Sequence, residues 1–129
     1  MNVGKSYINK NEYLNQKNKY VKGILNSGMK YITTKNKFHN SCSIMLLVRV
    51  GSKHENKDEY GCAHFLEHML FKGSKKYKKN IEINKLIDEL KISCNASTNK
   101  HFTEYHFSLP DYNFEKGMAL MNEMVFNSI

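Results

Sequence analysis

The chain has 129 residues, enough for one small domain with a modest hydrophobic core. Charged residues make up 25% of it and hydrophobic residues 40%, a balance typical of globular proteins that argues against a disordered chain. The sequence shows neither an apolar run of membrane-spanning length nor the apolar core of a signal peptide, so we expect no membrane partner and an intracellular, cytoplasmic location.

The net charge of +8 suggests nucleic-acid binding at first, but the kind of basic residue argues against it. Arg49 is the only arginine among 20 basic residues, and the lysines are mixed with asparagines, as an AT-rich coding sequence would produce. Runs such as KGSKKYKK, residues 72–79, therefore predict a solvated surface, and we expect no nucleic-acid partner.

In chain order, residues 1–21 are polar and aperiodic, which predicts an N-terminal arm. Residues 22–129 are expected to form a partial domain. It opens with a tight hairpin around Asn26-Ser27-Gly28. The continuous apolar run over residues 43–50 then predicts a central strand buried on both faces. A polar loop leads from this strand to a motif at residues 60–71.

Beyond the motif, a short amphipathic helix is predicted by apolar residues at helical spacing, namely Ile83, Leu86, Ile87 and Leu90. Residues 93–99 and 102–109 predict two strands. The last helix is predicted to bury a stripe of Phe114, Met118, Met121 and Val125. The order β-β-α-α-β-β-α predicts an α+β fold with helices packed on a mostly antiparallel sheet.

The segment GCAHFLEHMLFKGS, residues 61–74, places His64 and His68 four residues apart, with Glu67 beside the second histidine. On a helix these three side chains share one face, because successive residues turn by about 100°. The opposite face is apolar and is predicted to pack into a core; its residues are Cys62, Phe65, Leu66, Met69 and Leu70.

Two histidines at positions i and i+4 can direct one ring nitrogen each toward a shared Zn²⁺. Catalytic zinc sites also use a nearby carboxylate to take a proton from water, and Glu67 is placed for that role. A chance pair is the competing interpretation, since the chain has six histidines. The order H-x-x-E-H, a signature of inverted zinc proteases, favours the metal site.

The longer stretch GCAHFLEHMLFKGSKKY closely resembles the zinc-binding segment of the pitrilysin-like metallopeptidases, peptidase family M16. LNSGMKYI and VRVGSKHENKDEYG before it, and NASTNKHFTEYHFSL after it, also resemble that family. The resemblance covers roughly residues 22–129. It implies the incomplete N-terminal domain of a pitrilysin/mitochondrial-processing-peptidase-like fold. It also implies a zinc-dependent metalloendopeptidase with His64 and His68 as ligands and Glu67 as general base.

The same resemblance implies that Asn95, Ala96 and Thr98 belong to an edge strand that pairs with an extended peptide or protein substrate. It implies a third zinc ligand as well, a glutamate on a later helix. The sequence ends at Ile129, before that position. We therefore expect this ligand to come from a missing C-terminal part or from a second chain. None of the remaining candidates, Glu104, Glu115 and Glu123, matches the family position.

Two alternatives stay open. The first is a non-catalytic remnant or a subunit of the same family that binds a peptide or a partner. The second is a small structural zinc site made by His64, His68 and the thiol of Cys94.

Overall fold

The computed structural model describes residues 13–15, 20–35 and 38–129. Its residue contacts divide the chain into two units, residues 1–39 and 40–129. The expected boundary after residue 21 instead falls inside strand β2 (Tyr20–Ile24), and Tyr13–Asn15 of the expected arm forms strand β1. The rest of that arm, residues 1–12 and 16–19, lies outside the described residues. Nowhere in the described ranges is there a helix with the length and apolar character that a membrane crossing needs.

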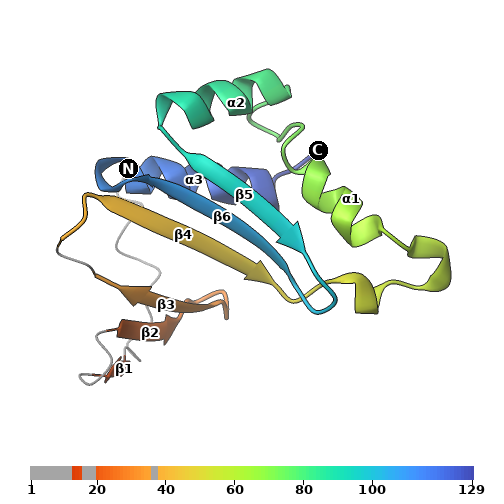
Figure 1. Cartoon of the computed structure of the whole chain (residues 1–129), viewed down its shortest axis with the longest axis horizontal. Coiled ribbons are helices and arrows are strands. Elements are labelled where there is room, and N and C mark those ends of the chain that lie inside the picture. The colour runs from red at the N-terminus through yellow and green to blue at the C-terminus, as the bar shows by residue number, and fades with distance from the viewer. Residues whose placement is uncertain (1–12, 16–19, 36–37) are drawn as a thin grey trace. The chain divides into compact units, whose positions relative to one another are not determined.

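The first unit contains a three-stranded antiparallel sheet in the order β1–β2–β3 (Figure 1). Strand β3 spans Lys30–Thr34 and pairs with β2, which confirms the predicted hairpin. In the connecting turn the Leu25 N–H donates to the Met29 carbonyl at 2.8 Å. Gly28 takes a φ of 84° there, a left-handed conformation that glycine adopts without steric cost.

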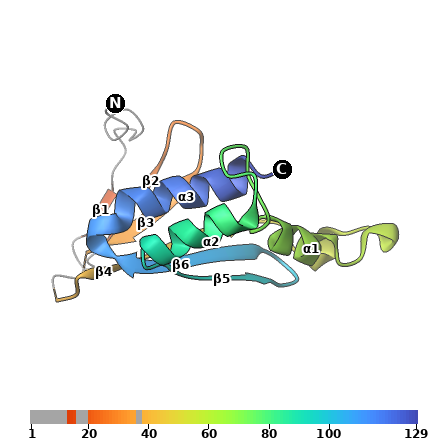
Figure 2. The ribbon, with the colours of Figure 1, turned by 90° about the horizontal axis from the view of Figure 1, so that it is seen from above.

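The second unit is a three-stranded antiparallel sheet with helices on one of its faces (Figure 2). The strands β4 (Ser41–Val48), β5 (Ser93–Thr98) and β6 (Thr103–Pro110) lie in the order β4–β6–β5. The helices are α1 (Cys62–Met69), α2 (Asn80–Glu89) and α3 (Phe114–Phe126). Single 3₁₀ turns span Ser52–His54, Lys57–Glu59 and Asp111–Asn113. The predicted α+β class is thus confirmed.

Strand β4 differs from its prediction in position and in burial. It begins at Ser41 and, among the described residues, forms one edge of its sheet. Ile44 is buried, but Met45 and Leu47 are 58% and 56% exposed. Side chains alternate between the two faces of a strand, so only one face of β4 packs on the core, and the prediction of burial on both faces is wrong. An apolar run alone does not reveal which faces are covered.

The stripe predicted for α3 is also partly wrong. Met121 is buried as predicted, whereas Phe114 and Met118 are 46% and 42% exposed. The buried side of the helix instead includes Gly117, because this glycine approaches β6 so closely that a Cβ there would collide with the Leu109 side chain. The buried side of α3 consists of Gly117, Leu120, Met121 and Met124, so it is turned from the predicted stripe toward Leu120 and Met124.

The core lies between the sheet and the helices, and Phe107 at its centre is 1% exposed. We expect Phe107→Ala to lower the free energy of unfolding by about 3–5 kcal/mol, because it removes a buried ring and leaves a cavity. Phe65→Ala is the matched control, since Phe65 is 66% exposed, and its effect should stay within about 0.5 kcal/mol. Urea unfolding measures the loss of stability in both variants. Similar losses for Phe107→Ala and Phe65→Ala would contradict this description of the core.

Candidate metal centre

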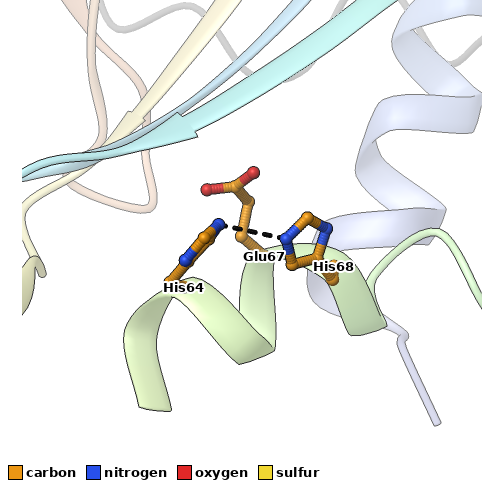
Figure 3. A group of neighbouring side chains, drawn as sticks. All are labelled: His64, Glu67 and His68. Atoms are coloured by element: carbon orange, nitrogen blue, oxygen red, sulfur yellow. Dashed lines mark hydrogen bonds between the residues drawn. The ribbon is translucent and has the colours of Figure 1, made fainter. Parts of the chain in front are cut away.

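Helix α1 brings the two motif histidines together. His64 Nε2 and His68 Nε2 lie 3.0 Å apart, and the ring centroids are 4.7 Å apart (Figure 3). Tetrahedral Zn–N bonds of about 2.0–2.1 Å place two ligand nitrogens roughly 3.3 Å apart. The separation of the two nitrogens is therefore close to that of two ligands of a shared zinc ion.

Glu67 lies between these histidines on the side of α1 that faces the sheet (Figure 3). It is only 6% exposed, and its Oε2 accepts a hydrogen bond of 2.5 Å from the Thr98 hydroxyl. One potential ligand atom from each of His64, Glu67 and His68 lies within 4.8 Å of the others. Burial, and after it the negative charge of Glu67, raises the pKa of Tyr105 on β6. The carboxylate is thus held against the sheet beside two exposed imidazoles.

The predicted sidedness of α1 is therefore wrong. Cys62 is exposed, and Phe65 and Leu66 are 66% and 57% exposed, whereas Glu67 is buried. Of the apolar residues predicted to enter the core, only Leu70 is buried. The reason is that the polar side of this short helix finds a hydrogen-bond partner on β5, while the described residues leave most of its apolar side uncovered.

Glu55 caps the N-terminus of the motif helix, a role that the sequence analysis missed. Its carboxylate accepts the Ala63 N–H at 2.8 Å and the Gly61 N–H at 2.9 Å. These hydrogen bonds, the one from Ala63 most of all, hold the pKa of Glu55 below its usual range. The first N–H groups of any helix need acceptors, and an acidic residue shortly before Gly61 is the signal that could have been read.

We expect Glu55→Ala to loosen α1 and lower thermal stability at neutral pH. Since the folded pKa lies below the ordinary value of about 4.3, the stabilisation is present above that value and is lost as pH falls through the folded pKa. The melting temperature of the variant should therefore lie below that of wild type at pH 7, and the two melting temperatures should converge in acid. Glu59→Ala is the control, because within the described ranges the Glu59 carboxylate accepts hydrogen bonds from Asn56 alone. A difference in melting temperature that persists unchanged in acid would contradict the role of Glu55 as a helix cap.

The loop after α1 is fixed to the end of α3. The Lys76 N–H donates to Glu123 Oε1 at 2.7 Å, and the Asn127 side chain donates to Glu123 Oε2 at 2.9 Å. The hydrogen bond from Lys76 is the main reason that the pKa of Glu123 is lowered. Ser74 in the same loop is fully buried and forms a β-bridge with Ser128. Glu123 is thus engaged in holding the loop.

The first of the two 3₁₀ turns before α1, Ser52–His54, is fixed to the hairpin between β5 and β6. The Ser52 N–H donates to the Asn99 carbonyl at 3.0 Å. The chain approaches so closely here that a Cβ on Gly51 would collide with that carbonyl. The Thr103 hydroxyl donates to the Val50 carbonyl at 2.9 Å. These contacts hold the end of β5 opposite the motif helix.

Strand β5 carries the three residues expected to bind substrate, and in the described part of the chain it forms the second edge of its sheet. Asn95 is exposed, while Ala96 and Thr98 are half-buried on the opposite face. The Ala96 N–H donates to Asn95 Oδ1 at 2.9 Å instead of to β6, which indicates that the backbone of Ala96 faces the free edge. The side chain of Thr98 is directed to Glu67.

Other possible metal ligands lie apart from this centre. Within the described ranges, His64, Glu67 and His68 form the only group of three potential ligands. Cys94 is half-buried on β5 outside this group, which argues against the structural zinc alternative. The acidic residues Glu104 and Glu115 also lie outside it.

Comparison with known proteins agrees with this geometry. Residues 30–129 match the family model of Insulinase (Peptidase family M16). A Rickettsia bellii protein named "Uncharacterized zinc protease" is 36% identical over 104 residues, which make up 81% of this chain and 25% of the relative. The mitochondrial-processing peptidase subunit beta of Rattus norvegicus is 29% identical over 104 residues, which make up 81% of this chain and 21% of that protein.

Solved structures give the same result. A protease from Helicobacter pylori superposes with a TM-score of 0.80 at 28% identity, over 86% of this chain and 26% of that one. The periplasmic protease PqqL from Escherichia coli gives a TM-score of 0.81 at 28% identity, over 87% of this chain and 13% of that one. The chain therefore spans about a quarter, or less, of the length of these relatives. Sequence and fold agree that it belongs to peptidase family M16, as its pitrilysin-like HFLEH segment predicts.

Proposed function

We propose that the chain carries part of the active site of a zinc-dependent metalloendopeptidase that hydrolyses peptide bonds. The observation that supports this most is the 3.0 Å approach of the two histidine Nε2 atoms beside the buried carboxylate of Glu67. Membership of family M16 and relatives named as zinc proteases support the same chemistry.

In this proposal His64 and His68 bind the zinc ion through their Nε2 atoms. When bound, zinc supplies a Lewis acid that polarises a water molecule and the scissile carbonyl. Glu67 accepts the proton of that water and later delivers it to the leaving amine. Thr98 occupies Oε2 of Glu67, so Oε1 is the oxygen left for this proton transfer.

The substrate in this proposal is an extended peptide that adds to the free edge of β5. Main-chain hydrogen bonds supply the affinity in such pairing, so the site tolerates varied sequences. The Ala96 N–H is a suitable donor, and the Asn95 side chain that now bonds it has to turn away first.

The third zinc ligand is proposed to come from polypeptide outside the described residues or from a second chain. Zinc in catalytic sites takes three protein ligands, and the described residues offer two histidines with Glu67 as the only neighbouring acidic group. The intracellular location expected from the sequence also stays a proposal. The E. coli relative is a periplasmic protease, and cell fractionation decides between the two compartments.

The test is to load the intact protein or complex that contains this chain with zinc, to incubate it with a mixture of unstructured peptides and to identify new termini by mass spectrometry. We expect cleavage that a chelator stops and added Zn²⁺ restores. A second candidate function is peptide binding without hydrolysis, which the free edge of β5 favours. An intact protein or complex that binds zinc and peptide but leaves every peptide uncut would contradict the first function and support the second.

A further inference from the structure

Among the described residues, Thr98 is the one side chain that hydrogen-bonds the Glu67 carboxylate. Its Oγ1 lies 2.5 Å from Glu67 Oε2 and joins β5 to α1 across 31 residues of sequence. The threonine hydroxyl donates this hydrogen bond and the carboxylate accepts it. The distance lies at the short end of the range for O–H···O hydrogen bonds.

The neighbouring hydroxyl does not compete for Glu67. Thr103 stands opposite Thr98 in the hairpin, with the two Oγ1 atoms 3.4 Å apart. Thr103 directs its own proton to the Val50 carbonyl at 2.9 Å. The proton of Thr98 is therefore the one available to Glu67, and the backbone contacts of the hairpin fix where that proton lies.

Without this bond, the carboxylate has a second possible position. Glu67 has an oxygen within 4.8 Å of the nitrogens of both His64 and His68, close enough to complete a three-ligand set by rotation of its side chain. Carboxylate oxygens bind zinc readily. A glutamate that binds the metal is no longer free to take a proton from water.

Building on the function proposed above, we propose that Thr98 is a positioning residue that keeps Glu67 beside the metal as a base and prevents it from becoming a ligand. This reassigns Thr98, which the sequence analysis placed among substrate-binding residues. Its side chain faces α1, so any contact with a peptide at the edge of β5 is made by its backbone. Asn95 and Ala96 keep their proposed role at that edge.

The test replaces Thr98 by valine, which has nearly the same shape but no hydroxyl, and by serine, which keeps it. Co²⁺ is added to each chain, and its visible spectrum reports the number and type of ligands. We expect Thr98→Val to shift the spectrum toward an added carboxylate ligand and to tighten Co²⁺ binding. Thr98→Ser should keep the wild-type spectrum. The spectrum of the double variant Thr98→Val/Glu67→Gln should return toward the wild-type spectrum, because this variant has no Glu67 carboxylate that could bind the metal.

Hydrolysis supplies a second readout. Thr98→Val should lower kcat by about 10- to 100-fold with little change in KM, the size of effect seen when partners of metal-site residues are removed. Ser97→Ala is the matched control, since Ser97 is exposed on the opposite face of β5, and it should change neither readout.

The two proposals fail in different ways. A wild-type chain that binds Co²⁺ through both histidines, together with a Thr98→Val variant that has the same spectrum, would overturn the role of Thr98 alone. A wild-type chain in which Co²⁺ does not contact the two histidines would overturn the proposed metal site, and the role of Thr98 with it.

Discussion

Replacing Glu67 by glutamine is expected to lower kcat for peptide hydrolysis by about 100- to 10,000-fold, the usual contribution of a general base. The fold should be retained, because the glutamine carbonyl still accepts the hydrogen bond that Thr98 donates to Glu67. Zinc affinity should also stay near that of wild type if Glu67 is a base and not a ligand. Steady-state kinetics and a zinc titration on the same preparations measure the two quantities.

Glu104→Gln is the matched control for this charge change. Glu104 lies on β6 and is not part of the group formed by His64, Glu67 and His68. It should leave kcat close to that of wild type. A Glu67→Gln variant that keeps most of the hydrolytic activity would contradict the assignment of the base, and a large loss of zinc affinity would indicate that Glu67 is a ligand.

Removing either motif histidine is expected to weaken zinc binding by at least about 100-fold. Loss of a residue that only supports a ligand costs about 10- to 100-fold, and loss of the ligand itself should cost more. His64→Ala and His68→Ala should behave alike, because their Nε2 atoms approach the same point. The double variant should lose little more than either single variant, since one histidine alone does not make the site.

His101→Ala is the control for these two variants. His101 is exposed in the turn between β5 and β6. It is the backbone N–H of His101 that donates a hydrogen bond to the Asn99 side chain. Competition with a coloured zinc chelator measures the wild type and the four variants on one scale. If one of the two motif histidines proved dispensable for zinc binding, the shared site would be wrong.

Much of the fold could be predicted because local patterns determine it. Gly28 marks the turn between β2 and β3, and the alternating Thr103, Tyr105 and Phe107 mark β6. Helix α2 lies where its apolar spacing predicts, with Ile83 fully buried. These signals act over a few residues, so they do not depend on what the rest of the chain does.

Which side of an element is buried could not be predicted in the same way. The pattern of α1 predicts that Phe65 and Leu66 are buried, yet both are exposed and Glu67 is covered. Burial depends on the surface that packs against an element, and only the tertiary structure supplies it. The same holds for β4, whose Met45 and Leu47 face outward.

The candidate metal centre could be predicted from the sequence because its three residues are local. A separation of four residues on one helix is enough to bring His64 and His68 together. Thr98 was placed near the site only by resemblance, and its bond to Glu67 depends on how β5 packs beside α1. Glu55 was missed because it acts on backbone N–H groups across a loop.

The most direct test of the central claim is a crystal structure of the zinc-loaded chain, with anomalous scattering recorded at the zinc absorption edge. We expect one zinc ion bonded to Nε2 of both His64 and His68 at about 2.0–2.1 Å. Glu67 should remain on the Thr98 hydroxyl, beside the ion but not bonded to it. Zinc found away from the two histidines, or bonded to the Glu67 carboxylate, would contradict the account.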